Sequence, residues 1–456
     1  MSMVVQHNMQ AANANRMLGI TSGAQAKSTE KLSSGYKINR AADDAAGLTI
    51  SEKMRKQIRG LDKASSNAQD GVSSVQTAEG ALTEVHSMLQ RMNELAVQAA
   101  NGTNSKDTDR KAIQDEIDQL NTEIDRVAET TKFNEIYLLK GDDGEKTVNM
   151  NAHDAGLKGT LVDNGSGKAT FTMKALSAGD SVSIGGKNYT IGSTATDAQK
   201  IVDAQKKAGG KVTVNGVEYT YNDTDSKWND AAGKEVKIGT GAAAGEIKIG
   251  AGDKVSDGTT TLTAMTDAKD ATGAAKADGI DDNDNSVITA EKAYSLAKDE
   301  LVAANHIGDT ENTAAVAQDT TNKNVFTITT GSAKVANTLS FSLHVGADAD
   351  MTNKITVDID TMNSANLGIK GLNVTDKNGT AATYAIDAIS DAISKVSSQR
   401  SALGAVQNRL EHTIDNLDNI SENTSSAESR IRDTDMAKEM VNYSKNNILA
   451  QAGQSM

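Results

Sequence analysis

The chain of 456 residues contains neither cysteine nor proline. Without cysteine it has no disulfide bond, no thiolate nucleophile and no cysteine-ligated metal. Average usage would supply roughly 20 prolines, each costing about 3 kcal/mol inside a helix, so their absence is consistent with long unbroken helices. Aromatic residues make up 3% of the chain, with one tryptophan. The chain therefore has too few aromatic residues for an aromatic-rich core or for a surface that stacks on nucleic-acid bases.

Positive charge and long apolar runs are also scarce. Lys and Arg number 47 against 61 Asp and Glu, for a formal net charge of -14. This argues against a general nucleic-acid binder, which needs a basic face, and disfavours binding to anionic membranes. No run of about 18 apolar residues predicts a transmembrane span, so we expect no membrane insertion. Residues 1–8 lack the basic and apolar regions of a cleaved signal peptide, so we expect any export to use another route.

Both ends of the chain carry heptad-like spacing of apolar residues, which predicts long helices packed along one seam. The N-terminal stripe, in steps of three or four, consists of Leu61, Ala64, Ala68, Gly71, Val75, Ala78, Leu82, Val85, Leu89, Met92, Ala96 and Ala99. The C-terminal part has one seven-residue series at Ile389, Val396, Leu403, Leu410, Leu417, Thr424 and Ile431, and a second at Val406, Thr413, Ile420 and Ala427. We expect the first helix to end near Ala100, with Gly102 in a left-handed cap. We expect an antiparallel second helix over residues 113–127.

Residues 141–336 differ, being rich in Gly, Thr and Asp and of strand character. The strand-like segments are 182–191, 211–220, 245–249 and 325–328. Alternation around Asn215-Gly216 predicts a hairpin, and residues 290–304 predict a helix. Residues 337–374 are expected to form two half-buried strands leading back to the C-terminal helix. The predicted fold class is therefore α+β: a long antiparallel helical bundle built from both termini, with a β-rich inserted outer region.

The sequence offers no catalytic or cofactor-binding constellation. The six histidines are scattered, without the HExxH spacing of a zinc site. Residues 239–245 resemble a phosphate loop but precede a strand pattern instead of a helix. Residues 281–292 resemble a calcium loop in which Ser286 replaces the turn glycine and Lys292 the bidentate carboxylate, so we expect at most weak calcium binding. We expect no enzyme, no cofactor and no catalytic or metal-ligating residue.

A basic run lies on the first predicted helix, at Lys53, Arg55, Lys56, Arg59 and Lys63. It is either a solvated face or a contact between subunits.

The two ends of the chain resemble those of bacterial flagellins, of the type found in gut Firmicutes. The matching motifs are KLSSGYKINRAADDAAGL at 31–48, QRMNELAVQ at 90–98, EIDRV at 123–127, SRIRDTD at 429–435 and ILAQAG at 448–453. The resemblance covers about residues 1–139 and 337–456, and the middle carries no family motif.

The resemblance implies a structural subunit that polymerises into the bacterial flagellar filament for motility. The implied partners are further copies of the chain in a helical homopolymer, a flagellar export chaperone and host Toll-like receptor 5, which would make the chain a ligand of innate immunity. The implied location is extracellular, on the bacterial flagellum. The chain would be secreted through the flagellar secretion channel without a cleaved signal peptide.

The resemblance also implies a domain map. Residues 1–44 and 433–456 would be terminal inner-tube helices. Residues 45–140 and 337–432 would form a rod domain of three long helices and a strand pair. Residues 141–336 would be a hypervariable, surface-exposed insert, whose ligand and glycosylation the sequence does not predict.

For receptor binding, the resemblance implies Gln90, Arg91, Leu95 and Gln98 on the first helix and Glu116 on the second. Arg91 and Leu95 are four residues apart and so share a helical face. Leu95 also borders the apolar stripe, so packing inside the protein is its alternative role. The strength of receptor activation stays open, because Asn93 stands where many activating members carry a basic residue.

Members of the family usually continue past the position of Met456 into an apolar, Leu-rich tail, so without one we expect weaker inner-tube contacts. Two alternatives remain open at this point. One is an adhesin or fibre-like binding protein with a helical stalk. The other is an enzyme carried in the insert, although no spaced pair of carboxylates favours glycosidase chemistry there.

Overall fold

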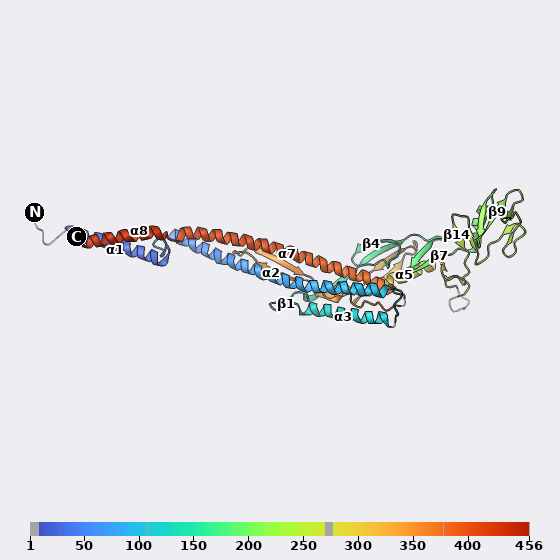
Figure 1. The fold of residues 1–456 in the computed structure, drawn as a ribbon, viewed down its shortest axis with the longest axis horizontal. Coiled ribbons are helices and arrows are strands. Elements are labelled where there is room, and N and C mark those ends of the chain that lie inside the picture. The colour runs from blue at the N-terminus through green and yellow to red at the C-terminus, as the bar shows by residue number, and fades with distance from the viewer. Residues whose placement is uncertain (1–8, 107, 270–276, 377, 456) are drawn as a thin grey trace, which may run out of the picture. The chain divides into compact units, whose positions relative to one another are not determined.

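The computed structural model describes residues 9–106, 108–269, 277–376 and 378–455 (Figure 1). The chain divides into two compact units. The terminal unit comprises Met1–Thr77, Ser340–Asp358 and Ser401–Met456, and the central unit comprises Ala78–Leu339 and Ile359–Arg400. Two long helices, α2 (Ala45–Ala100) and α7 (Thr380–Arg432), contribute residues to both units. No helix among the described residues is long and apolar enough to span a membrane.

The two long helices confirm the stripes predicted at both ends of the chain. Every residue of the N-terminal stripe is buried in α2. In α7 the first series is buried from Ile389 to Leu417, and its last two members are half-buried. In the second series, three of the four residues are half-buried and Ile420 is exposed. Each helix therefore has one packed seam, as the seven-residue spacing requires.

The terminal unit has its core where α2 and α7 meet a strand pair. The pair is β19 (Leu339–His344) and β20 (Lys354–Ile359), joined through the short helix η1 (Met351–Asn353), and it confirms the strands expected there. The buried core residues are Leu61, Ala64, Ala68, Val345, Ile355, Leu410 and Leu417. The helix and the strand pair approach closely at Gly71, because a Cβ atom there would lie 2.2 Å from Leu343 Cδ1 and that side chain would have to move.

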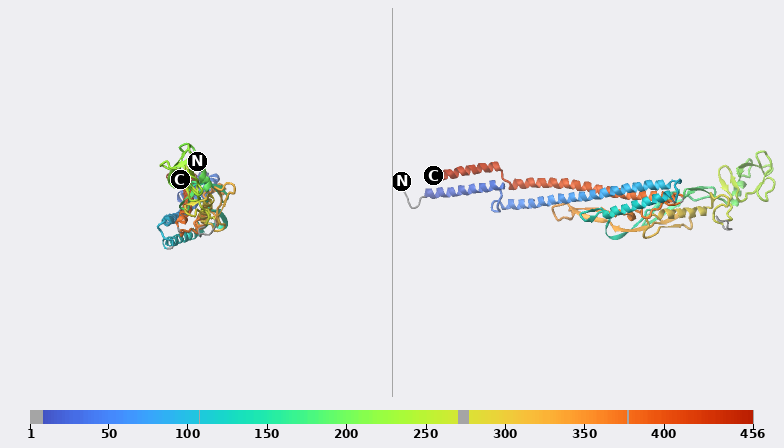
Figure 2. Two further views of the ribbon diagram at one scale, coloured as in Figure 1. Left: turned by 90° about the vertical axis from the view of Figure 1, so that its right-hand side faces the viewer. Right: turned by 60° about the horizontal axis from the view of Figure 1, so that its bottom comes forward.

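Helices α1 (Met9–Ser34) and α8 (Met436–Ser455) run side by side within the terminal unit, as Figure 1 and the right-hand view of Figure 2 show. They are antiparallel, since Leu18 lies near Gly453 while Tyr36 bridges to Asp433 at the other end. The chain turns at residues 41–43 between α1 and α2.

In the central unit, α3 (Asp109–Thr130) packs antiparallel to the C-terminal half of α2, as predicted. Arg91 bonds to Glu116 and Arg110 bonds to Ala99, so the paired residue numbers run in opposite directions. The buried face of α3 consists of Arg110, Ile113, Ile117, Ile124 and Ala128.

The left-handed cap predicted at Gly102 is wrong, because Gly102 does not have a positive φ. The helix does end at Ala100, but the buried Arg110 side chain caps it instead. Its Nε donates to the Ala99 carbonyl at 2.8 Å and its Nη2 to the Asn101 carbonyl at 3.1 Å. Its Nη1 donates to the Asp376 carbonyl at 2.9 Å. A guanidinium at this end also suits the negative pole of the helix dipole.

The remaining elements of the central unit are mostly short strands. The strands are β1 (Lys132–Phe133), β2 (Ile136–Tyr137), β3 (Asp142–Asn149), β4 (Gly159–Gly165), β5 (Lys168–Met173), β6 (Ser181–Ile184), β7 (Lys187–Ile191), β8 (Lys211–Val214), β9 (Val217–Asn222), β10 (Lys227–Asn229), β11 (Lys237–Ile238), β12 (Glu246–Ile247), β13 (Lys254–Ser256), β14 (Thr261–Thr263), β15 (Val287–Ile288), β16 (Ala315–Gln318), β17 (Val325–Thr329) and β18 (Ser332–Asn337). The helices among them are α4 (Ala195–Ala204), α5 (Ala290–Asn305) and α6 (Ser364–Leu367).

The hairpin predicted at Asn215-Gly216 is present. β8 and β9 pair around Asn215 and Gly216, whose φ values of 49° and 83° match the left-handed turn that Asn-Gly favours. β6 and β7 pair across two glycines in the same way. The strand at 325–328 and the helix at 290–304 are confirmed by β17 and α5.

Strands β3 and β18 form an antiparallel ladder from Asp142 opposite Asn337 to Asn149 opposite Ser332. The chain leaves and re-enters the helical region through this one ladder. Between the two strands lie two cores. One packs α5 on the sheet β16-β17-β5-β4, and the other packs α4 on the sheet β10-β9-β8-β13-β14.

Candidate functional site

The apolar surface of α1 and α8 is the first candidate site. Its members are large apolar side chains at least 47% exposed: Met9, Met17, Ile20, Met436, Met440, Val441, Ile448 and Leu449. We call this set the terminal-helix surface. Helices of 26 and 20 residues thus hold eight of the sixteen exposed large apolar side chains among the described residues. Such a concentration is typical of a surface that binds another molecule.

The same two helices bury almost nothing within the chain. Ser28 is the one buried residue of α1 and Ala450 that of α8. Helices in water are marginal without a packed face, so α1 and α8 gain little stability from the chain itself.

A junction at Tyr36 and Arg432 attaches α1 and α8 to the long helices. The Lys37 amide donates to the Arg432 carbonyl at 2.6 Å, and the Thr434 amide to the Gly35 carbonyl at 3.0 Å. The Arg432 guanidinium lies 4.7 Å from the Tyr36 ring centroid and 2.9 Å from a Glu52 oxygen. Gly35, with φ of 77°, supplies the left-handed residue that ends α1.

The second candidate site is the surface where receptor contacts are expected. Arg91 of α2 and Glu116 of α3 form an ion pair at 2.9 Å. Arg91 also reaches Glu94 at 3.1 Å. Glu116 and, second, Glu94 raise the pKa of the Arg91 guanidinium by hydrogen bonding to its charged form. This pair spans two helices, so it fixes both side chains in place.

The other expected receptor residues separate into two groups. Gln90 and Gln98 are exposed on α2, and Gln90 shares a 3.1 Å hydrogen bond with His86. Leu95 is 2% exposed, so the packing role is the one the structure favours. The apolar side chain that α2 does expose nearby is Val97, at 54%. Sequence spacing missed it because Val97 lies off the apolar stripe.

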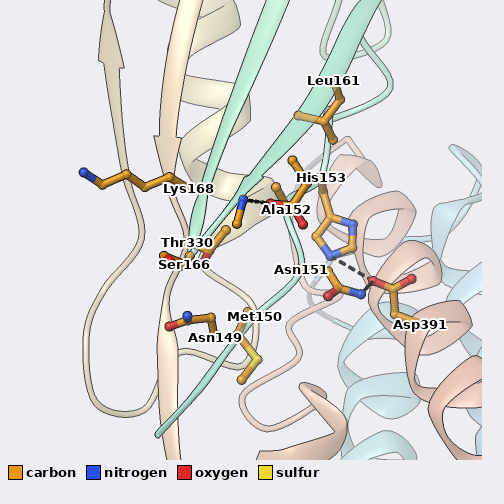
Figure 3. A pocket seen from close by; sticks show the side chains of 13 residues that line it. Asn149, Met150, Asn151, Ala152, His153, Leu161, Ser166, Lys168, Thr330 and Asp391 are labelled. Carbon is orange, nitrogen blue, oxygen red and sulfur yellow. Dashed lines mark hydrogen bonds and ion pairs between the residues drawn. The ribbon is translucent and has the colours of Figure 1, made fainter.

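A polar groove of about 540 Å³ lies where the segment after β3 meets α7 (Figure 3). Asn151 Nδ2 donates to Asp391 Oδ2 at 2.8 Å, and His153 Nε2 lies 3.8 Å from the same oxygen. Ser166 lines the groove, but within the described residues no hydrogen bond joins it to the His153 ring. The groove therefore lacks the nucleophile–base contact of acyl-transfer chemistry.

The calcium-like loop is organised by its own backbone. Asp281 Oδ2 accepts from the Thr266 amide at 2.6 Å, and its Oδ1 accepts from the Asn283 and Asp284 amides at 2.9 and 3.0 Å. These bonds occupy the carboxylate that would open a calcium site. Among the described residues, no group of three or more His, Cys, Asp or Glu could hold a metal.

Comparison with known proteins places these features in a family. Residues 5–143 match the bacterial flagellin N-terminal helical region, and residues 386–456 match the C-terminal helical region. "Flagellin" of Clostridium tyrobutyricum is 38% identical over 457 residues, covering 100% of this chain and 98% of the relative. "Flagellin B" of Vibrio anguillarum is 34% identical, covering 100% and 96%.

Among solved structures, the one described as "3D structure of FliC from Burkholderia pseudomallei" is 20% identical. The match covers 74% of this chain and 99% of that chain, with a TM-score of 0.24.

Proposed function

The chain belongs to the bacterial flagellin family, and from that premise we propose that the terminal-helix surface makes the principal contacts between copies. A flagellin is a structural protein and not an enzyme. It polymerises into the filament of the extracellular flagellum. Relatives that align over the whole chain remove the alternative of an adhesin or fibre protein.

One observation carries this assignment of the contacts: α1 and α8 expose eight large apolar side chains and bury one residue each. Fully burying one such side chain contributes about 1.5–3 kcal/mol. Association costs an estimated 4–15 kcal/mol in lost translational and rotational freedom. Burying the eight side chains of the terminal-helix surface would contribute stabilisation of the same order. Heterologous contacts of this kind extend without closing, as a filament requires.

The test compares one substitution at two exposed valines. Val441→Glu places a charge on α8, and Val217→Glu places it on the β8–β9 hairpin; these valines are 68% and 51% exposed. With short filament seeds, we expect Val441→Glu to leave the chain monomeric by sedimentation and negative-stain electron microscopy. The Val217→Glu control should elongate the seeds as the parent chain does. Normal elongation by Val441→Glu would reject the terminal-helix surface as the contact.

The domain map follows from the same proposal. Residues 1–44 and 433–456 form the inner tube, and residues 45–140 and 337–432 form the rod. Residues 141–336 form the outer, solvent-facing insert. Cryo-electron microscopy of the filament tests this map through the radius at which each segment lies.

We further propose export through the flagellar secretion channel, with a flagellar chaperone and without a cleaved signal peptide. Its support is that α1 and α8 gain little from the chain alone, so these ends can stay unfolded until assembly. Deleting the flagellar export gate should keep the protein inside the cell. Secretion that continues in that strain would contradict this route.

We also propose that the surface around Arg91 binds host Toll-like receptor 5. Gln90, Arg91, Gln98 and Glu116 are exposed there, and an Arg positioned by ion pairs is typical of binding hot spots. Leu95 is buried, so within this proposal it supports the surface from beneath, and Val97 is the accessible apolar contact.

The receptor proposal is tested with two exposed arginines in ion pairs. Arg91 pairs with Glu116, and Arg126 pairs with Glu123 elsewhere on α3. We expect Arg91→Ala to weaken binding to the receptor ectodomain by about tenfold or more, the effect of a 1.4 kcal/mol hot spot. Arg126→Ala should bind as the parent does. Equal dissociation constants for Arg91→Ala and the parent would reject this surface.

A further inference from the structure

A short segment of α2 in the terminal unit is basic within an acidic chain. Residues 52–63 contain five Lys and Arg against Glu52 and Asp62, whereas the whole chain has a formal net charge of -14. Lys56, Arg59 and Lys63 recur three and four residues apart and so share one face of the helix. All three are exposed. We call residues 52–63 the basic segment.

The facing helix of the same unit carries the opposite charge. Residues 411–422 of α7 contain Glu411, Asp415, Asp418 and Glu422, with no Lys or Arg. Their spacing of four, three and four residues places all of them on one face. All four are exposed. We call this set the acidic face.

Most of these charges are not paired with an opposite charge in the part of the chain that the structure describes. Among the described residues, Lys56, Arg59 and Lys63 form no ion pair within 4 Å, and neither does any member of the acidic face. The recorded side-chain contacts of the acidic face are neutral: the Ser65 hydroxyl donates to Asp418 at 2.9 Å, and the Gln407 amide to Glu411 at 2.9 Å. In the basic segment, Arg55 reaches Glu52 at 3.8 Å.

The two charged regions lie at different levels along the helix pair. The Ser421 hydroxyl donates to Asp62 and the Ser65 hydroxyl to Asp418, so residue 62 of α2 faces residue 421 of α7 and residue 65 faces residue 418. The acidic face is therefore centred beside residue 66 or 67 of α2, whereas the basic segment is centred near residue 58. At 1.5 Å per residue, the two centres are roughly 13 Å apart along the axis.

We propose that the basic segment of one copy docks on the acidic face of a second copy that is displaced along the helix axis. This contact rests on the proposed polymerisation and adds a charged, register-setting interface to the apolar one on α1 and α8. A displaced copy leaves an unused basic segment at one end and an unused acidic face at the other. That arrangement is heterologous and grows without closing. Complementary charges also favour this register over an unshifted one, in which the basic segments would face each other and the acidic faces would face each other.

The experiment reverses each charge set in the full chain. The first variant carries Lys56→Glu, Arg59→Glu and Lys63→Glu. The second carries Glu411→Lys, Asp415→Lys and Glu422→Lys, and it keeps Asp418 because Ser65 depends on it. The control carries Lys158→Glu, Lys187→Glu and Lys207→Glu, three exposed lysines of the central unit. Circular dichroism establishes that each variant retains the helix content of the parent chain.

Each charge-reversed variant alone should raise the critical concentration for seeded growth by about tenfold or more, since like charges now face each other. An equimolar mixture of the two should restore growth, and the filaments should contain both variants in equal amounts. The control and the parent should grow normally.

Several results would overturn the proposal. Growth of either variant at the parent's critical concentration would do so, and so would a mixture that stays monomeric. Closed dimers in the mixture, seen by light scattering, would show a symmetric contact instead of a displaced one. The parent and the control report separately on polymerisation itself, so the failure of this contact is distinguishable from the failure of the proposed function.

Discussion

Helices α3 and α8 are nearly equal in length, with 22 and 20 residues, but α3 buries most of its large apolar side chains and α8 exposes most of its own. α3 buries five residues, including Ile113, Ile117 and Ile124. α8 buries Ala450 alone and leaves Ile448 and other large apolar side chains exposed. α3 therefore completes its packing inside one chain. The apolar residues of α8 stay unpacked within the chain, and we propose that another copy covers them in the filament.

The first prediction compares the same substitution in the two helices and has the largest expected effect. Ile117→Ala should lower the free energy of unfolding by about 2–5 kcal/mol, because the side chain is fully buried and leaves a cavity. Ile448→Ala should change it by less than about 0.5 kcal/mol, because the side chain is exposed. Urea unfolding of the monomer measures both. If both substitutions lowered the free energy of unfolding by a similar amount, α3 and α8 would not differ in how much their apolar side chains stabilise the monomer.

The second prediction concerns the buried cap between α2 and α3. Arg110→Met should cost about 1.5–3 kcal/mol, since it removes the charged donor from three carbonyl groups and leaves them without a partner. Arg126→Met, at an exposed ion pair on the same helix, should cost less than about 0.5 kcal/mol. Thermal unfolding of the two variants gives the comparison. If the Arg110→Met chain were as stable as the parent, hydrogen bonds from water would replace those from Arg110 to these carbonyl groups without loss of stability.

The third and smallest effect lies in the inserted region and depends on pH. The Ser177 amide first, and then Lys174, hold the pKa of Asp180 below its usual value. A depressed pKa in the folded state contributes stability above the unfolded pKa, and this contribution is lost as the pH falls through the folded value. Asp180→Asn should therefore be less stable than the parent above about pH 4 and equal to it in stronger acid. A difference that persists at low pH would show that the charge is not its cause.

The helical part of the fold could be predicted because its signal is periodic and local. Every position of the α2 stripe is buried, and the spacing of Leu410 and Leu417 correctly predicted the packed seam of α7. The hairpin at Asn215-Gly216 was equally predictable, since that pair is suited to the turn whatever surrounds it. These features depend on residues close together in sequence.

Features that depend on distant residues were not predictable in the same way. The cap by Arg110 joins residues on α2, α3 and the loop at Asp376, and no spacing of residues in the sequence predicts it. The ladder of β3 with β18 links strands almost two hundred residues apart, and alternation alone does not identify a strand's partner. Burial of Leu95 was foreseen as an alternative, because it borders the stripe. The exposure of Val97 required the structure.

The most direct test of the account is amide hydrogen exchange of α1 and α8, measured in the monomer and in the seeded filament, with α2 as the internal reference. We expect fast exchange of α1 and α8 in the monomer, because they bury one residue each, and strong protection in the filament. The buried stretch of α2 should be protected in both states. If α1 and α8 in the monomer already exchanged as slowly as α2, the claim that these helices are completed by other copies would be contradicted.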